Sequence, residues 1–309
     1  MSEVLRIAIV GFGEIARRQH APAIAKTQGT ALVAIADPVN ASPGLAHFSD
    51  LQELLRSGPE IDAVALCTPP QIRHAQAALA LAAHKHVLLE KPPGATVSEV
   101  MPLIAAAEGA GRTLFATWHS RYASAVEPAR RLLADRRLVR VTIIWKEDVR
   151  IWHPGQAWIF EAGGFGVFDP GINALSILTR ILPDQVFVRR AELAFPVNRA
   201  APIAAELDLS DVNGLPIRAE FDFRQTGPQS WDMLFETDAG NVTLSKGGAQ
   251  LRDGDRLIVD ARDEEYPGLY RRFATLASQG KSDVDLTPLQ LVADSFMLGR
   301  RRFVEPFED

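Results

Sequence analysis

A glycine-rich turn near the beginning of the sequence has the composition of a phosphate-binding loop. The apolar run LRIAIV at 5–10 leads directly into GFGEIA at 11–16, and apolar residues at helical spacing follow. Gly11 allows a tight turn, Gly13 allows the backbone to approach a pyrophosphate, and a helix N-terminus offers free N–H groups. Two glycines between a strand and a helix can also serve packing alone. The residues expected to contact a nucleotide here are Gly11, Phe12, Gly13, Glu14 and Ile15.

A carboxylate at the end of the next apolar run strengthens this prediction. The run ALVAIA at 31–36 ends at Asp37, which lies 24 residues beyond Gly13. A carboxylate at that distance can accept hydrogen bonds from ribose hydroxyls, so the turn and Asp37 together predict a dinucleotide site. The three residues after Asp37 include no Arg or Lys that could pair with a 2'-phosphate. We therefore expect NAD as the cofactor, with NADP as the alternative.

Two further turns follow apolar runs in the same part of the chain. In a parallel sheet, ligands bind beyond the carboxyl ends of the strands, so both turns are expected at the cofactor. A lysine at this edge lies beside a cationic nicotinamide ring, which favours its neutral form and its use in catalysis. Alternatively, Glu90 and Lys91 form a solvated ion pair and the prolines only end the strands. The residues of these turns are Thr68, Pro69, Pro70, Glu90 and Lys91.

The elements that must position these turns alternate between strands and helices up to about residue 118. The apolar runs show no alternation of polar and apolar residues, which implies strands covered on both faces. We predict an N-terminal Rossmann domain over residues 1–120, with a doubly wound parallel sheet of α/β class. Its expected strands are 5–10, 31–36, 63–67, 86–90 and 113–117, and its expected helical segments are 14–28, 49–57, 74–83 and 97–111.

The second half of the chain has a different pattern. A helical segment at 123–135 is followed by runs that alternate polar and apolar residues, and Asn213-Gly214 between two of them is a strong hairpin signal. A closing helix is expected around 287–301. We predict an α+β domain over 121–309 with a mainly antiparallel sheet, which binds the substrate. A sheet with one uncovered face also suits a homo-oligomer.

Composition excludes several classes of protein. The chain has 309 residues, 33 Lys plus Arg and 38 Asp plus Glu, so its net charge of -5 offers no field for nucleic acid or an anionic membrane. No apolar run reaches the roughly 18 residues of a membrane span, and no signal peptide precedes the first strand. We expect a cytoplasmic protein that acts on a small molecule. The single cysteine, Cys67, is expected to be a buried and inert thiol.

Four motifs together resemble the Gfo/Idh/MocA family of oxidoreductases. They are GFGEIA at 11–16, the TPP turn at 68–70, KHVLLEKP at 85–92 and GGFGVFDPGIN at 163–173. The resemblance covers essentially the whole chain. Within the family, the runs FATWHSR, WKEDVRIWHPGQAW and FDPGINALSI are most similar to bacterial aldose 1-dehydrogenases that act on L-arabinose and D-galactose. The resemblance implies that Lys91 lies near the reacting carbon.

The last of these motifs departs from the common family pattern at one position. The family's D-x-G-x-H is represented by Asp169, Gly171 and Asn173, so an amide replaces the His that would accept a proton. The resemblance implies that the base is Asp169 or Lys91. Asp169 and Asn173 are four residues apart, so at a helix start their side chains face the same way. A structural alternative is that Asp169 caps the helix with Pro170 at its first position.

Several polar and aromatic residues complete the expected substrate site. His119 follows the last expected strand of the first domain, Glu147 ends a strand of the second, and His153 begins the next loop. Ordinary structural roles are the alternative for all three. Trp152 and Trp158 offer platforms for the apolar face of a sugar, with burial between the domains as the alternative, and Trp158 is also expected beside the cofactor. The expected substrate-binding residues are His119, Glu147, Trp152, His153 and Asn173.

These features predict an NAD-dependent aldose 1-dehydrogenase. A hydride leaves C1 of a pyranose for the nicotinamide, a proton leaves O1 for Asp169 or Lys91, and the product is the aldonolactone. Asn173 and His153 would hold O1 and the ring oxygen, and no metal is needed. One alternative is a dehydrogenase or reductase of a cyclitol or keto sugar in the same family. The other is a non-catalytic regulator that senses NAD.

Overall fold

The computed structural model describes residues 4–261 and 264–308, and the chain divides into two units. The first unit comprises Met1–His119 and Tyr266–Leu286, and the second comprises Ser120–Glu265 and Thr287–Asp309. The segment Tyr266–Leu286 therefore returns to the first unit late in the sequence. A single boundary near residue 120 does not include this return.

The first unit is built on a parallel sheet of six strands in the order β3-β2-β1-β4-β5-β6. The chain moves outward from β1 in both directions, so the strand order reverses between β1 and β4, as in a doubly wound nucleotide-binding sheet. This confirms the predicted Rossmann fold. The strands are β1 (Leu5–Val10), β2 (Thr30–Ala36), β3 (Ala46–Phe48), β4 (Ala63–Leu66), β5 (His86–Leu89) and β6 (Leu114–Ala116).

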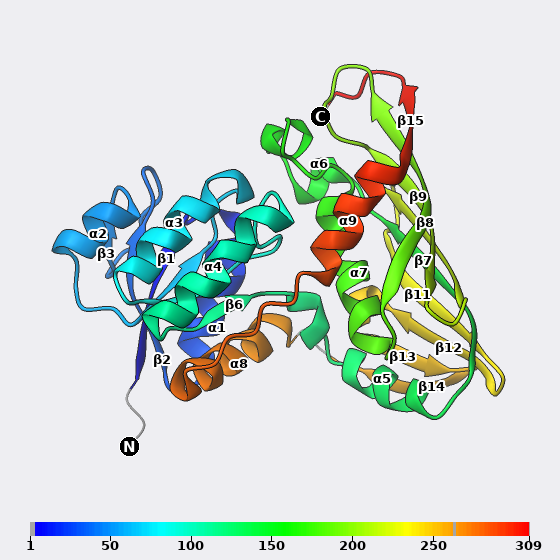
Figure 1. Cartoon of the computed structure of the whole chain (residues 1–309), viewed down its shortest axis with the longest axis horizontal. Helices are drawn as coiled ribbons and strands as arrows, with labels where there is room; N and C mark the ends of the chain where they lie inside the picture. The colour runs from blue at the N-terminus through cyan, green and yellow to red at the C-terminus, as the bar shows by residue number, and fades with distance from the viewer. Residues whose placement is uncertain (1–3, 262–263, 309) are drawn as a thin grey trace. The chain divides into compact units, whose positions relative to one another are not determined.

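Helices cover both faces of this sheet, which explains why its central strands are mostly apolar. In Figure 1, α2, α3 and α4 lie together on one face, and α1 and α8 lie on the other. The last of these, α8, comes from the returning segment and was not among the predicted helices. The helical elements are η1 (Ala16–His20), α1 (Ala21–Lys26), α2 (Leu51–Ser57), α3 (Pro70–Ala82), α4 (Val97–Ala110) and α8 (Glu265–Gln279).

The second unit is built on a nine-stranded sheet in the order β14-β13-β12-β11-β7-β10-β9-β8-β15. Neighbouring strands are antiparallel except for the pairs β7 with β10 and β8 with β15. The prediction of a mainly antiparallel sheet is confirmed. Its strands are β7 (Leu138–Lys146), β8 (Val186–Pro196), β9 (Ala204–Asp211), β10 (Pro216–Asp222), β11 (Ser230–Thr237), β12 (Gly240–Ser245), β13 (Gln250–Asp253), β14 (Arg256–Asp260) and β15 (Gly299–Val304).

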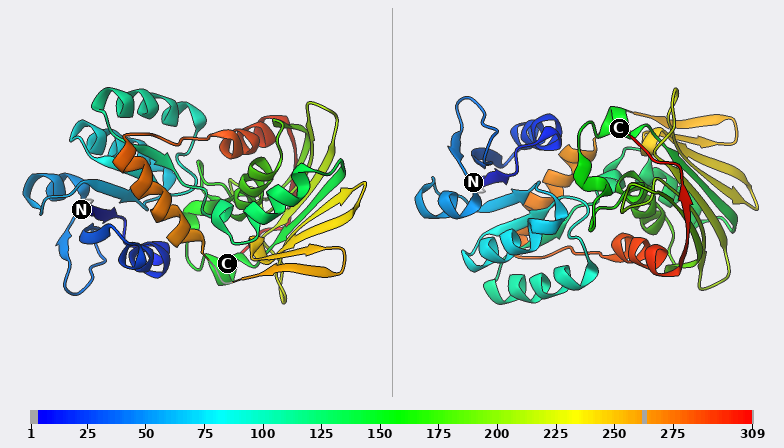
Figure 2. Two further views of the ribbon diagram at one scale, coloured as in Figure 1. Left: turned by 90° about the horizontal axis from the view of Figure 1, so that it is seen from below. Right: turned by 90° about the horizontal axis from the view of Figure 1, so that it is seen from above.

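Helices α5, α7 and α9 lie on one face of this sheet, and both views in Figure 2 show no helix of the described chain on the other face. The expected helix at 287–301 ends earlier, at Leu298, and the chain continues as the edge strand β15. The helical elements of this half are η2 (His119–Tyr122), α5 (Val126–Ala134), α6 (Val149–Trp152), η3 (Ala157–Phe160), α7 (Phe168–Ile181), η4 (Lys246–Gly248) and α9 (Thr287–Leu298).

Within the described ranges, no helix combines the length and the apolar character that crossing a bilayer requires.

Candidate nucleotide and substrate sites

The glycine-rich turn of the first unit joins β1 to the π-helix η1. Gly11 has a φ of +83°, and a Cβ there would lie 2.8 Å from Thr68 Cγ2 and 2.9 Å from Thr68 N. Glycine is therefore required at this position for the backbone angle and for close packing. A Cβ on Gly13, in contrast, would meet no described atom within 4 Å. The open space beside Gly13 fits the approach of a pyrophosphate.

The helical segment after this turn begins without a side-chain cap, because Ile15 makes no capping hydrogen bond. The first N–H groups of a helix have no partner within the helix and attract an anion. Glu14 is an exposed side chain that pairs with Arg17 Nη2 at 3.3 Å and with Arg18. This acid lies near the expected phosphates, and the two arginines compensate its charge.

Asp37, at the end of β2, is buried and hydrogen-bonded to the glycine-rich turn. Its Oδ2 accepts a hydrogen bond of 2.7 Å from the N–H of Phe12, and its Oδ1 accepts bonds from the N–H groups of Val39 and Asn40. Burial alone would raise the pKa of Asp37, but the N–H groups of Asn40, Phe12 and Val39 lower it below its usual value. Asp37 is therefore an anion beside the turn.

A buried arginine ties together the two turns predicted at the nucleotide edge. Arg73 of α3 is 2% exposed, and its guanidinium donates hydrogen bonds to the carbonyl oxygens of Thr68, Glu90 and Pro92. Both turns are therefore fixed by one side chain. Arg73 was not among the predicted site residues. Its position three residues after the Thr-Pro-Pro turn was the signal that could have identified it.

The carboxylate of Glu90 is buried immediately after β5. Its Oε2 lies 3.0 Å from His20 Nε2 and 3.3 Å from Thr117 Oγ1, and its Oε1 lies 3.4 Å from the hydroxyl of Tyr266. Glu90 is 3% exposed, so the alternative that it forms a solvated ion pair with Lys91 is wrong. Lys91 follows in the turn and is half-buried.

His119 and Cys67 also belong to the first unit. The ring of His119 stacks on Tyr266, with ring centroids 5.1 Å apart and an interplanar angle of 17°. Cys67, at the end of β4, is only half-buried, so the expectation of a buried thiol is wrong. A short apolar strand ends before this residue, which leaves the thiol at the edge of the sheet where ligands bind.

In the second unit, three predicted site residues come together. His153 Nε2 lies 3.4 Å from Asp169 Oδ2 and 3.9 Å from Glu147 Oε1. Both carboxylates are buried, at 4% exposure for Asp169 and 6% for Glu147. Asp169 lies at the start of α7, Glu147 directly follows β7, and His153 directly follows the short helix α6. The result is an imidazole between two carboxylates, which can hold and exchange protons with a bound hydroxyl.

Trp231, which was not among the predicted site residues, supports this cluster. Trp231 of β11 donates a hydrogen bond of 2.9 Å from its indole N–H to Glu147 Oε2. Its ring meets Trp152 edge to face, with centroids 5.4 Å apart, and Trp152 remains 49% exposed. Trp152 therefore lies at the surface of the second unit, with its ring held against Trp231. Trp158 lies on the separate element η3 and is half-buried.

The motif that contains Asp169 forms the first turns of α7. The N-cap of this helix is Val167, so the alternative that Asp169 is the cap with Pro170 at the first position is wrong. A Cβ on Gly171 would lie 2.9 Å from the ring of Phe221, so glycine lets the helix pack closely on β10. Asn173 lies one turn after Asp169 and is half-buried. The helix therefore presents both polar groups from adjacent turns, as expected from their spacing.

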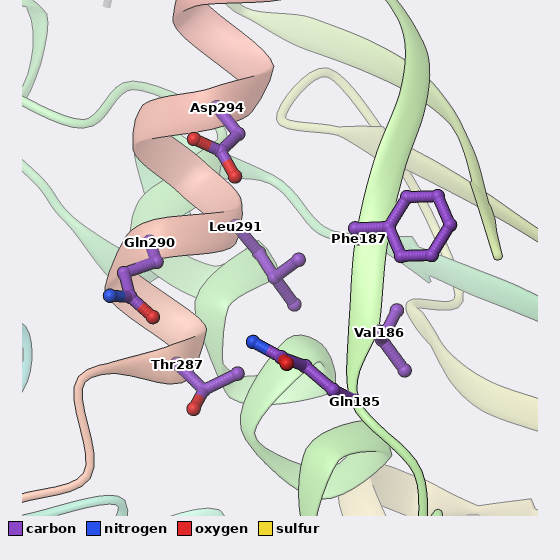
Figure 3. Close-up of a pocket in the computed structure, with 7 residues that line it drawn as sticks. All are labelled: Gln185, Val186, Phe187, Thr287, Gln290, Leu291 and Asp294. Atoms are coloured by element: carbon purple, nitrogen blue, oxygen red, sulfur yellow. The ribbon is translucent and has the colours of Figure 1, made fainter. Parts of the chain in front are cut away.

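Two further features of the described chain help to delimit these sites. Residues 4–261 and 264–308 contain no group of three or more His, Cys, Asp or Glu side chains that could hold a metal ion. A hollow of about 250 Å³ in the second unit lies between β8 and α9 (Figure 3) and includes none of the predicted site residues. Its lining residues are Gln185, Val186, Phe187, Thr287, Gln290, Leu291 and Asp294.

Comparisons with known proteins agree with this architecture. The Gfo/Idh/MocA model, described as an oxidoreductase family with an NAD-binding Rossmann fold, matches residues 5–117. The chain is 47% identical over 306 residues to galactose 1-dehydrogenase of Pseudomonas fluorescens, covering 99% of both chains. The crystal structure of a D-galactose-1-dehydrogenase protein from Rhizobium etli matches with a TM-score of 0.95 and 56% identity, covering 100% of this chain and 99% of that one.

A more distant structure shares the fold alone. It is a 3-ketoreductase from Actinomadura kijaniata in complex with TDP-benzene and NADP, with a TM-score of 0.84 and 18% identity over 98% of this chain and 100% of that chain. Its likeness extends through both units, beyond the residues that the family model matches. From the full-length similarity and the nucleotide-binding sheet together, this chain belongs to the Gfo/Idh/MocA family of oxidoreductases.

Proposed function

We propose that this protein is an NAD-dependent aldose 1-dehydrogenase that oxidises D-galactose or L-arabinose to the aldonolactone. The observation that carries the proposal is the imidazole of His153 between the carboxylates of Asp169 and Glu147. The similarity over nearly the full length to a galactose 1-dehydrogenase supports this substrate class. The first unit binds the nucleotide, and the second binds the sugar.

The reaction removes a hydride from C1 and a proton from O1, so that a lactone carbonyl forms. NAD, when bound, accepts the hydride. Asp169 accepts the proton from O1, and Lys91 is the alternative acceptor that the family resemblance implies. His153 holds the Asp169 carboxylate from 3.4 Å and contacts the sugar oxygens together with Asn173, whose amide can donate to one oxygen and accept from another.

The remaining contacts to the sugar come from groups that the fold already holds in place. Glu147 is fixed by Trp231 and binds a hydroxyl of the pyranose. Trp152 packs against the apolar face of the ring, for which its exposed indole is suited. His119, stacked on Tyr266, binds a further hydroxyl. The positions of these charged and aromatic side chains around the ring determine which sugar epimer can bind.

The anionic Asp37 supports NAD over NADP. Its Oδ2 accepts one hydrogen bond, from Phe12, and a carboxylate oxygen can accept a second from a ribose hydroxyl. A 2'-phosphate beside this anion would be repelled. A cation nevertheless lies near this position, because Arg17 Nη1 is 3.4 Å from Asn40 Oδ1. The ratio of kcat/KM for NAD and NADP tests which charge dominates.

The experiment is an absorbance assay of reduced nicotinamide with NAD or NADP and a panel of D-galactose, L-arabinose, D-glucose, D-xylose and myo-inositol. Turnover on the first two sugars, with a lactone that hydroxylamine traps, supports the proposal. Turnover on myo-inositol alone assigns a cyclitol dehydrogenase. NAD binding without turnover on any of the five overturns the aldose proposal.

We further propose that the uncovered face of the nine-stranded sheet forms a homo-oligomer. Charged side chains of both signs line this sheet around Arg190, Glu206 and Arg218, which can pair across a two-fold axis. Light scattering after size exclusion tests this with the parent and with Arg218→Glu. The reaction draws on the NAD pool, so we place the protein in the cytoplasm, which cell fractionation tests.

A further inference from the structure

The first unit contains a buried pair of opposite charges, one member of which is the residue directly before Lys91. Glu90, the residue before the lysine, is 3% exposed, and His20 is fully buried. The two side chains lie 3.0 Å apart, between Glu90 Oε2 and His20 Nε2. They are separated by 70 residues in sequence, so the fold brings them together.

His20 occupies a defined position in the nucleotide-binding part of the fold. It is the last residue of η1, the π-helix that follows the glycine-rich turn, and π-helical turns occur frequently at functional sites. Its Nδ1 lies 2.7 Å from the hydroxyl of Tyr270, and its ring meets Tyr266 edge to face with centroids 4.8 Å apart. Both ring nitrogens therefore have partners, so the orientation of the imidazole is fixed.

The surroundings of this pair favour the charged form of both side chains over the neutral form. Burial alone would lower the pKa of His20, but Cys67 and Glu90 outweigh it and raise the pKa to about 10. Burial alone would raise the pKa of Glu90, but His20, followed by the charges of His119 and Lys91, lowers it to about 2. At neutral pH the pair is an imidazolium and a carboxylate.

Packing alone does not explain a buried ion pair at this place. Two well-packed apolar side chains commonly stabilise a fold as much as a buried ion pair does. This pair joins the end of the nucleotide-binding helix to the residue that precedes Lys91. Thr117, directly after β6, and Tyr266 of α8 also contact the Glu90 carboxylate.

We propose that the buried His20–Glu90 pair, anchored by Tyr270, positions Lys91 and sets the charge around its ammonium group. Loss of this pair should therefore slow hydride transfer more than it weakens nucleotide binding. This proposal rests on the proposed function, in which Lys91 serves the reaction. The groups that face the pair from the surrounding elements are Cys67, Lys91, Thr117, His119, Tyr266 and Tyr270.

The charges of this pair predict opposite effects on Lys91 for the two single variants. Glu90→Gln removes the carboxylate and leaves the cations of His20 and Lys91 without it, which favours the neutral amine of Lys91. His20→Gln removes a cation and keeps the carboxylate, which favours the ammonium form. A role in packing alone gives no reason for the two variants to differ in direction.

The first measurement follows covalent labelling of Lys91 by an acylating reagent as a function of pH, with mass spectrometry of the peptide. We expect labelling of Lys91 at a given pH to be faster than in the parent for Glu90→Gln and slower for His20→Gln. His86→Gln is the matched control, because His86 begins the same strand and accepts a hydrogen bond from Thr113 N at 3.0 Å. This measurement needs neither cofactor nor sugar.

The second measurement is steady-state kinetics normalised to the number of NAD-binding sites. We expect kcat to fall by about a hundredfold in Glu90→Gln, as for a misplaced catalytic group, while the Kd for NAD changes by less than about threefold. The double variant Glu90→Gln with His20→Gln should cost little more than the worse single variant, because the pair acts as a unit. If Glu90→Gln does not fold, the double variant, which leaves no unpaired charge, provides the same kinetic test.

An unshifted labelling profile in both single variants, with kcat per NAD-binding site unchanged, would overturn the positioning proposal. Absence of sugar oxidation by the parent protein would instead overturn the proposed function, and the labelling experiment would still decide the role of the pair.

Discussion

The imidazole Nε2 of His153 lies 3.4 Å from Oδ2 of Asp169, and both residues belong to the second unit. The family's D-x-G-x-H pattern ends here in Asn173, yet an imidazole still reaches the aspartate from a different part of the chain. Asp169 lies inside the first turn of α7 and is not the cap of this helix. This relationship leads to the first prediction.

Replacing Asp169 by Asn should lower kcat by about 10²- to 10⁴-fold, because the amide keeps the shape of the side chain but cannot accept a proton. The Kd for NAD should not change. Asp184→Asn is a suitable control, because Asp184 is in the same unit and accepts a hydrogen bond from Asn213 at the surface. Stopped-flow measurement of the first turnover checks the prediction. A normal rate in Asp169→Asn would transfer the role of base to Lys91.

Replacing Trp231 by Phe should raise the KM for the sugar by about tenfold and leave kcat nearly unchanged. The phenyl ring keeps an aromatic contact with Trp152 but loses the hydrogen bond to Glu147, and bonds to charged groups contribute roughly 1.5–3 kcal/mol. Trp145→Phe serves as the control. Its buried indole N–H has no hydrogen-bond partner in the described chain, so no such bond is lost. Equal KM values in the two variants would remove Glu147 from sugar binding.

The His20–Glu90 pair predicts a specific dependence of stability on pH. The folded-state pKa of His20 is about 10 against a usual 6.5, so its contribution is complete below pH 6.5 and is lost as the pH rises toward 10. The folded-state pKa of Glu90 is about 2 against a usual 4.5, so its contribution is complete above pH 4.5 and is lost toward pH 2. The pair therefore stabilises most between pH 4.5 and 6.5.

Urea unfolding at several pH values measures this effect. Either single variant, Glu90→Gln or His20→Gln, should lose about 3–5 kcal/mol of unfolding free energy near neutral pH, because one buried charge remains without its partner. The double variant should lose less and should no longer show the decline toward alkaline pH. If the parent and the double variant decline alike, other groups cause the pH dependence.

Replacing Arg73 by Met should weaken NAD binding and lower kcat together. The guanidinium holds carbonyl oxygens of both turns at the nucleotide edge, and removing it leaves three buried acceptors without their donor. Arg56→Met, an exposed position at the end of α2, is the control. Calorimetric titration with NAD checks the prediction, and an unchanged Kd would show that the turns hold their positions without Arg73.

Much of the fold followed from local patterns. Five of the six strands of the first unit were predicted, because their cores are buried on both faces and mostly apolar. The edge strand β3 was missed, because it has only three residues and is largely exposed. The return of Tyr266–Leu286 to the first unit, which carries α8, was missed, because sequence order gives no indication of it. The hairpin of β13 and β14 was also missed, although Asp253-Gly254 between two short runs is a turn signal that could have found it.

Only part of the candidate site could likewise be predicted from the sequence. Residues that belong to short motifs, such as Gly11, Lys91 and Asp169, were predicted from those motifs. Their partners were not, because the contacts span long separations: Trp231 and Glu147 are 84 residues apart, and His20 and Glu90 are 70 apart. Neither pairing has a local pattern, so only the folded chain reveals it.

The central claim is that C1 of an aldose gives up the hydride, and an isotope-transfer experiment tests it most directly. The protein is incubated with NAD and D-galactose that carries deuterium only at C1, and the reduced nicotinamide is analysed by mass spectrometry. Our account predicts reduced cofactor that contains one deuterium, together with a lactone that has lost it. Reduced cofactor without deuterium would show that oxidation occurs at another carbon and would contradict the assignment of a 1-dehydrogenase.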